Sequence, residues 1–313
     1  MAVSSRWGLT LPLPGIPLAQ HREVLQEAER LGYTDAWSQD TDQGDPFTPL
    51  AVAAASTRQM RLGTMIANTF THGPAVLAMS ALSLAEAAPG RFCLGLGSSS
   101  PVIVQDWNGI PFGKPLTRTK DVFLLVREAL DGGRVNRILE TARMQSFRLG
   151  RPLPAPVPMY LAAMRPGMLH LAGQMADGVL INWLGAADVP KVVATLREAA
   201  LEAGRDPGAV EVVCRVFVAM HDDRELAYTA ARRAIALYLN TPAYRAFHRW
   251  LGNEQLYGEM WQRWDAGDRR GAVLALSEEA VDYLIGIGDA DRCHAFVAAY
   301  RASGVDTPVL AFA

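Results

Sequence analysis

The sequence predicts an α/β fold, a (β/α)8 TIM barrel with insertions, formed by a single domain that spans residues 1–313. Short apolar runs of strand length alternate with amphipathic stretches of helix length along most of the chain. Such alternation gives parallel strands joined by right-handed crossovers, with the helices outside. About eight units of this kind suggest closure into a barrel. The last run would then lie beside the first, which argues against dividing the chain into two domains.

Each predicted strand is a short apolar run. The first, residues 7–11, is followed by Pro12 and Pro14, so we expect it to end in a turn. The remaining strands are expected at residues 35–38, 62–67, 92–96, 159–162, 178–182, 210–218 and 307–312.

Each predicted helix carries apolar residues at helical spacing. Residues 18–31 show one apolar face and end at Gly32, a residue that commonly stops helices. The last helix begins at Asp289, which can cap it, and ends at Gly304. One further helix is expected to begin at Pro46. The others are expected to cover residues 74–87, 116–130, 166–174, 189–203 and 225–239.

Two stretches do not fit the repeat, and we interpret both as insertions on the barrel. Residues 131–157 are rich in Arg and Pro, and residues 240–288 are rich in Trp and Tyr. The tryptophans allow two interpretations, the wall of an apolar pocket or the core of a helical insertion. The residues concerned are Trp183, which fits only the first interpretation, and Trp250, Trp261 and Trp264.

The composition argues against several classes of function. The 30 Lys and Arg and 32 Asp and Glu give a net charge of −2, so no basic surface for nucleic acid is expected. Half of the residues are apolar, which is enough for a large core. No apolar stretch approaches the roughly 20 residues that span a bilayer, and no signal peptide is recognised. Cys93, Cys214 and Cys293 lie far apart, so we expect buried thiols in a cytoplasmic protein.

The active site of a TIM barrel lies where the strands end, so the residues directly after each strand are candidates. Here they are small and polar, with few titratable groups and no lysine. This argues against a hydrolase or an aldolase, which need a dedicated base, nucleophile or Schiff-base lysine. The candidates are Asp40, Asn68, Thr69, His72, Gly95, Gly97, Ser98, Ser99, Ser100, Ala163, Met164, Arg165, Asn182 and Trp183.

Two of these segments suggest contact with a ligand. The sequence GLGSSS at residues 95–100 matches neither GxGxxG nor a P-loop, so it is either a place where a flat ring approaches the backbone or a tight turn. At residues 162–168 a strand leads directly into a helix, whose free N–H groups could bind an anion together with Arg165. The alternative is an ordinary strand–helix junction without a ligand.

Asp40 and His72 are weak candidates for acid–base chemistry. His72 could exchange a proton or donate a hydrogen bond, or it could simply contact the start of the next helix. Asp40 shares its loop with Asp42 and Asp45, and such loops are most often only solvated. The 6 histidines form no pair at metal-ligand spacing, so no metal site is expected.

Several segments, taken in order, resemble the luciferase-like superfamily. The resemblance is to the branch that uses the deazaflavin coenzyme F420 and is similar to methylenetetrahydromethanopterin reductase. Residues 107–115 and 304–310 look like the actinobacterial type of this branch. The other segments are WSQD at residues 37–40, LGTMIAN at 62–68, GP at 73–74, RFCLGLG at 91–97, PMYLAA at 158–163 and LAGQMADG at 171–178.

The resemblance implies a coenzyme ring held at the barrel mouth, in a protein that forms a homodimer through its barrel helices. It also implies a non-prolyl cis peptide bond between Met65 and Ile66, which would form a bulge behind the ring. The residues implied for the coenzyme are Asp40, Asn68, Leu96 and Gly97 at the ring, and Met164, Arg165, Gly167 and Met168 at the phosphate.

Two departures from the family bear on the reaction. Members that oxidise sugar phosphates have a histidine and a glutamate where this chain has Thr41 and Ser98, so that activity is not expected. We therefore expect an F420-dependent oxidoreductase that transfers a hydride between the deazaflavin and a small organic substrate, with an unsaturated or imine-like compound being reduced. The alternatives are an FMN-dependent luciferase-like monooxygenase and a non-catalytic flavin- or deazaflavin-binding protein.

Overall fold

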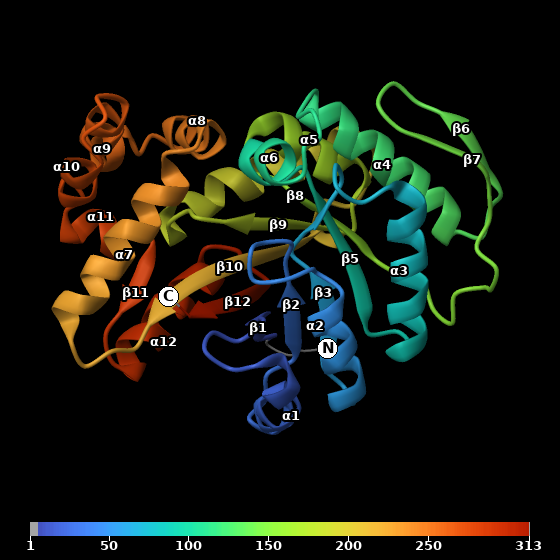
Figure 1. Ribbon diagram of the computed structural model, residues 1–313, viewed down its shortest axis with the longest axis horizontal. Helices are drawn as coiled ribbons and strands as arrows, with labels where there is room; N and C mark the ends of the chain where they lie inside the picture. Colours follow the sequence, from blue (N-terminus) through green and yellow to red (C-terminus); the bar gives the residue numbers. More distant parts are fainter. Residues whose placement is uncertain (1–5, 313) are drawn as a thin grey trace.

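The computed structural model describes residues 6–312 and contains a closed parallel barrel surrounded by helices (Figure 1). The final strand pairs with the first, Gly8 with Val309, which closes the ring and confirms the predicted TIM barrel. In order around the barrel, the strands are β1 (Gly8–Leu11), β2 (Asp35–Ser38), β3 (Arg61–Thr64), β5 (Phe92–Gly97), β8 (Met159–Ala162), β9 (Gly178–Asn182), β10 (Glu211–Ala219) and β12 (Thr307–Phe312).

The helices cover the outside of the barrel and bury outward-facing residues of the strands. Leu62 of β3 and Leu94 of β5, for example, belong to the core between strands and helices. Asp289 caps the last helix by accepting a hydrogen bond from the N–H of Arg292, as its sequence position predicts. The barrel helices are α1 (His21–Arg30), α2 (Thr48–Ser56), α3 (Pro74–Ala87), α4 (Pro115–Leu130), α5 (Pro166–Met175), α6 (Val189–Glu202), α7 (Arg224–Leu239) and α12 (Ala290–Ala302).

The third predicted strand, residues 62–67, is wrong in one respect, because the structure divides it. β3 ends at Thr64, and a short strand β4 (Ala67–Asn68) pairs with the end of β5. Between them lies a cis peptide bond from Met65 to Ile66, at the position that the family resemblance implies. The chain therefore leaves the regular strand path at the barrel mouth.

The two stretches outside the repeat form structure of their own. Residues 131–157 contain an antiparallel hairpin of β6 (Val135–Ile138) and β7 (Arg143–Phe147), at the right of Figure 1. Together with α7, the second stretch forms a group of helices that we name the helical lobe, at the left of the same view. A three-residue strand, β11 (Ile285–Ile287), pairs with β10 and was not predicted. The inserted helices are α8 (Pro242–Leu251), α9 (Glu254–Asp265), α10 (Arg269–Leu274) and α11 (Glu278–Asp282).

The tryptophans of this lobe do not line the barrel mouth. Trp261 is buried in the lobe core, and its indole N–H donates to the carbonyl of Leu239 at 3.0 Å. Trp264 and Trp250 are partly buried, and Arg269 and Lys191 stack on their respective rings. Of the two interpretations, the core of a helical insertion is therefore correct for Trp261.

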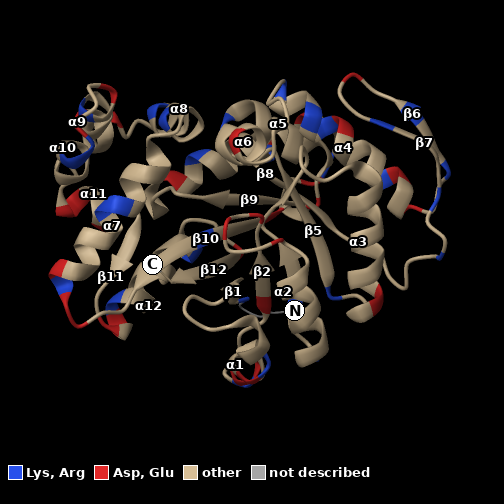
Figure 2. Cartoon of the chain, viewed as in Figure 1, with Lys and Arg blue, Asp and Glu red and all other residues tan. Residues whose placement is uncertain are grey.

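Charged residues lie mainly on the outer helices, the loops and the β6–β7 hairpin, whereas the barrel strands carry few of them (Figure 2). Cys93, Cys214 and Cys293 are buried free thiols, as predicted, and burial raises the pKa of Cys93 to about 12. Within residues 6–312, no helix is both long and apolar enough to cross a membrane.

The barrel interior is filled by layers of inward-facing side chains. An ionic layer closes the base, where Asp35, Arg61 and Glu211 begin their strands. An apolar layer follows, centred on Trp37 and Leu180. Above it, toward the strand ends, the interior becomes polar. The carboxyl ends of the strands are where TIM barrels usually carry their active sites.

Candidate active site at the barrel mouth

Three of the predicted candidates, Asp40, Asn68 and His72, meet at the mouth. The Nε2–H of His72 donates to Oδ2 of Asp40 at 2.8 Å, since a carboxylate can only accept. The same oxygen accepts the backbone N–H of Asn68 at 3.0 Å. The backbone N–H of Asp40 in turn donates to the carbonyl of Ile66 at 3.1 Å. The loop after β2 is thus fixed to the bulge after β3.

Asp40 is therefore not simply one of several solvated aspartates. Its side chain is 17% exposed, and that of His72 is 21% exposed. Asp42 is exposed, and Asp45 accepts the backbone N–H groups of Phe47 and Thr48 near the start of α2. Asp40 thus holds Nε2 of His72, whereas Nδ1 of His72 has no hydrogen-bond partner within residues 6–312.

Asn68 is fully buried and carries a polar group without a partner. Its Oδ1 accepts the backbone N–H of Phe70 at 2.9 Å, but its Nδ2 has no partner within residues 6–312. A buried donor left unpaired costs about 1–3 kcal/mol. An acceptor on a bound ligand would relieve this cost, so Asn68 fits a ring that presents carbonyl oxygens.

The glycines of β5 make room for the bulge between Met65 and Ile66. A Cβ on Gly95 would lie 2.0 Å from the carbonyl oxygen of Thr64, and a Cβ on Gly97 would lie 3.0 Å from Cγ1 of Ile66. Neither of the two interpretations of residues 95–100, a flat ring against the backbone or a tight turn, included this role of the glycines in packing. The side chain of Leu96 points the other way, into the core below the helices, so only its main chain can face a ligand.

The start of α5 provides a separate place for an anion. Arg165 occupies the N-cap position and is exposed, no side chain caps the helix, and Pro166 occupies its first turn. Gly167 is exposed as well, whereas Met164 and Met168 are half-buried against the outer core. The free N–H groups and the positive end of the helix dipole favour a phosphate at this turn.

At the opposite end of the barrel, the ionic layer is internally satisfied. Arg61 pairs with Asp35 and donates two hydrogen bonds to Glu211, at 2.7 and 2.8 Å. Tyr160 and Thr307 also donate to Glu211. Burial alone would raise the pKa of Glu211, but the Arg61 guanidinium holds it at about 2. Sequence reasoning missed this layer, although charged residues at the first position of apolar strands were its signal.

Sequence reasoning also missed Arg215, the one charged residue within the apolar run VVCRVFVA of β10. Its neighbours in register are Asn182 of β9 and Val309 of β12, and Val309 belongs to the interior core. Arg215 therefore points into the barrel. One of its terminal nitrogens donates to Oε1 of Gln39, directly after β2, at 2.7 Å.

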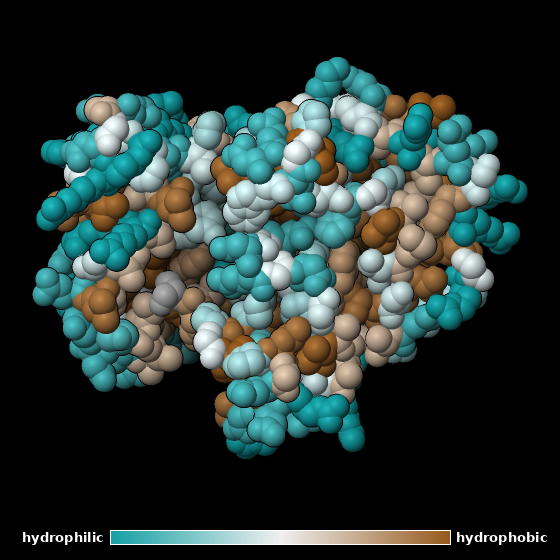
Figure 3. Space-filling model, viewed as in Figure 1, coloured by the Kyte–Doolittle hydropathy of each residue, from teal (hydrophilic) through white to brown (hydrophobic). Residues whose placement is uncertain are grey.

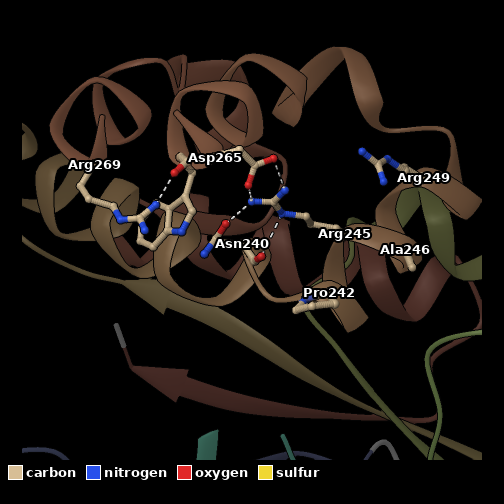
Figure 4. A pocket seen from close by; sticks show the side chains of 8 residues that line it. Asn240, Pro242, Arg245, Ala246, Arg249, Asp265 and Arg269 are labelled. Atoms are coloured by element: carbon tan, nitrogen blue, oxygen red, sulfur yellow. Dashed lines mark hydrogen bonds and ion pairs between the residues drawn. The ribbon is translucent and has the colours of Figure 1, made fainter. Parts of the chain in front are cut away.

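A hollow of about 500 Å³ lies away from the strand ends, between α8, α9 and α10 (Figure 4). Its arginines have partners: Arg245 pairs with Asp265 at 2.8 Å, and Arg269 packs on Trp264 at 4.2 Å. By contrast, Figure 3 shows hydrophobic residues where the surface is hollowed between the helical lobe and the centre of the molecule. We therefore place the candidate site at the barrel mouth.

Comparison with known proteins adds the family. The family model described as luciferase-like monooxygenase matches residues 2–307. A Mycobacterium tuberculosis protein named as a coenzyme F420-dependent oxidoreductase is 29% identical, over 99% of this chain and 96% of its own length. The 5,10-methylenetetrahydromethanopterin reductase of Methanolobus tindarius is 33% identical, over 72% of this chain and 68% of its own length.

Solved structures share the fold. The coenzyme F420-dependent tetrahydromethanopterin reductase of Methanopyrus kandleri superimposes with a TM-score of 0.81 at 23% identity, covering 98% of this chain and 92% of that chain. An EDTA monooxygenase from Chelativorans superimposes with a TM-score of 0.72 at 13% identity, covering 99% of this chain and 89% of that chain. The chain is an enzyme that belongs to the luciferase-like monooxygenase family.

Proposed function

We propose that this protein is an F420-dependent oxidoreductase that transfers a hydride between the deazaflavin coenzyme and a small organic substrate. The observation that carries the proposal is the unpaired, fully buried amide nitrogen of Asn68, two residues beyond the bulge at Met65 and Ile66. A flat ring with carbonyl oxygens satisfies that donor. The name of the Mycobacterium tuberculosis relative, which includes coenzyme F420, supports F420 as the coenzyme.

The residues at the mouth divide into two groups for this coenzyme. Asn68 and the main chain at Leu96 and Gly97 would contact the ring. Asp40 would support this side of the site by accepting the backbone N–H of Asn68. Four residues at the start of α5 would hold the phosphate through backbone N–H groups and one guanidinium. These four are Met164, Arg165, Gly167 and Met168.

When bound, the coenzyme supplies the hydride chemistry, and the chain orients and protonates. Asp40 holds the imidazole of His72 through Nε2, and Nδ1 of His72 can give a proton to the substrate or take one from it. Phe47 packs edgewise against this imidazole, with ring centroids 5.6 Å apart, and limits its rotation. His72 is accordingly the residue that we propose for proton exchange, with Asp40 as its positioning residue.

The test is a titration of the protein with oxidised F420 and, separately, with FMN, followed by absorbance and fluorescence. We expect F420 to bind more tightly, and Asn68→Ala to weaken its binding by about tenfold or more. Tight binding of FMN without measurable affinity for F420 would overturn the proposal and favour an FMN-dependent monooxygenase. Coenzyme binding without turnover on a broad panel of unsaturated and imine substrates would favour a non-catalytic binding protein.

We further propose that the protein is a cytoplasmic homodimer that acts on a small molecule and binds neither nucleic acid nor membranes. The balanced net charge of −2 supports the lack of affinity for nucleic acid. Light scattering measures the oligomeric state directly, and a mass equal to one chain would contradict the dimer.

A further inference from the structure

Arg215 is a partly buried cation without a counter-ion in the described part of the chain. Its only hydrogen-bond partner there is the neutral amide of Gln39, and its Nε is buried with no partner. The guanidinium lies over the ring of Phe217, 4.9 Å from the centroid. Burial lowers the pKa of Arg215 from its ordinary value, but guanidinium groups remain charged in proteins. A charge that is partly withdrawn from water and lacks an opposite charge is costly, so its retention calls for a reason.

The surroundings of Arg215 form one aromatic wall at the ends of β9 and β10. Trp183 follows β9 and packs on Phe217 at 4.1 Å and on Tyr238 of α7 at 4.8 Å. Tyr244 of α8 donates to Oδ1 of Asn182 at 3.1 Å. The indole N–H of Trp183 is another buried donor without a partner in residues 6–312. The wall therefore offers flat apolar surfaces together with unsatisfied donors.

The backbone of Trp183 is held in an uncommon conformation, with a φ of 52°. A bulky side chain seldom adopts this left-handed region, and such residues cluster at functional sites. The stacking of Phe217 and Tyr238 on the indole keeps Trp183 in place. These contacts fix the orientation of the indole within the wall.

The position of the wall separates it from the proposed coenzyme contacts. In the ring of eight strands β10 stands four places from β3, so Arg215 lies across the barrel from the bulge at Met65 and Ile66. A ring placed against that bulge leaves β9 and β10 facing its free side. The substrate must occupy this side, because a hydride passes only between groups in contact.

We propose that the wall formed by Trp183, Phe217, Tyr238 and Arg215 recognises the substrate, and that the substrate is a planar organic molecule with a carboxylate or similar oxyanion. Arg215 binds the oxyanion with its guanidinium, and the aromatic rings contact the apolar part of the molecule. The inference rests on the proposed function, since it names the substrate class for the same site. No covalent step is attributed to the wall.

The test uses benzoate as the probe and benzamide as its neutral counterpart, with binding followed by tryptophan fluorescence and calorimetry. The proteins are the full chain and its variants Arg215→Met and Arg215→Lys. A matched control is Arg197→Met, which removes an exposed arginine from α6. Circular dichroism and thermal melting verify the fold of each variant.

We expect the unaltered chain to bind benzoate about tenfold or more tightly than benzamide, because a charge-assisted hydrogen bond is stronger than a neutral one. Arg215→Met removes this preference because it weakens the binding of benzoate far more than that of benzamide, whereas Arg215→Lys retains part of the preference. Arg197→Met changes neither. Equal binding of benzoate and benzamide by the unaltered chain, no binding of benzoate, or an unchanged preference in Arg215→Met would overturn the proposal.

A separate F420 titration of Arg215→Met distinguishes the substrate from the coenzyme as the source of the anion. Unchanged F420 affinity together with lost benzoate preference supports a substrate anion. Reduced F420 affinity with intact benzoate preference assigns Arg215 to the coenzyme and overturns the proposal. Failure of F420 to bind even the unaltered chain counts against the proposed function, while the benzoate measurements still report on the wall.

Discussion

Two inward-facing arginines at opposite ends of the barrel have opposite environments. Arg61, at the base, pairs with the carboxylates of Asp35 and Glu211. Arg215, near the mouth, has only the amide of Gln39 and an aromatic ring within residues 6–312. The base is electrostatically complete without a ligand, whereas the mouth keeps unpaired donors. The difference supports a structural role for the base and the placement of the proposed site at the mouth.

Removal of Arg61 tests the base of the barrel, where the charges are paired, and should have the largest effect on stability. Arg61→Met leaves the carboxylate of Glu211 without a cation, although Asp35 keeps its ion pair with Arg6 at 3.0 Å, so we expect a loss of roughly 3–5 kcal/mol in the free energy of unfolding. Urea denaturation followed by circular dichroism measures this loss, with Arg197→Met on α6 as the control. A loss similar to that of the control would show that the base layer contributes little.

Low pH should destabilise the ionic layer at the base of the barrel, because Glu211 becomes protonated. The pKa of Glu211 is about 2 in the folded protein, against 4.5 for an unperturbed glutamate. Because the folded value is the lower one, the stabilisation is complete above pH 4.5 and is lost as the pH falls from 4.5 to 2. The shift corresponds to about 3 kcal/mol. Stability measured against pH should lose this component in Glu211→Gln, and an identical pH profile in that variant would contradict the assignment.

The glycines of β5 test the packing of the mouth. Gly95→Ala places a methyl group 2.0 Å from the carbonyl oxygen of Thr64, so we expect a loss of about 1–3 kcal/mol in stability. Gly97→Ala is a matched comparison with a milder clash, because its nearest neighbour is a side-chain atom of Ile66 at 3.0 Å. Thermal melting of both variants should rank Gly95→Ala as the less stable. The reverse order would mean that the bulge adapts at Gly95.

Removal of Arg215 should have the smallest effect on stability, in the direction opposite to that of Arg61. Arg215→Met replaces a partly buried, unpaired cation with an apolar side chain of similar length, which is neutral or stabilising by up to about 1 kcal/mol. The same urea denaturation measures it. A loss as large as that of Arg61→Met would show that Arg215 is a structural residue and would remove the contrast between the two ends.

Features that depend on local patterns could be predicted from the sequence, whereas features that depend on contacts between distant segments could not. The alternation of apolar runs and amphipathic stretches predicts the barrel because each pattern reports local burial. The positions of Asp40, Asn68 and His72 follow from strand order, because strand ends converge in a barrel. The split of the third strand after Thr64 and the short strand β11 could not be predicted, because pairing between distant segments creates them.

By itself, then, the sequence determined the fold class, the end of the barrel where we propose the site and the family to which the chain is similar. Only the tertiary structure decided which polar residues are paired. Arg61 and Arg215 both stand in apolar strands, and the sequence does not show which of them finds a carboxylate. That depends on residues such as Glu211, 150 positions from Arg61, which folding brings to hydrogen-bond distance. The unpaired donors at the mouth exist only in three dimensions, and they carry the functional inference.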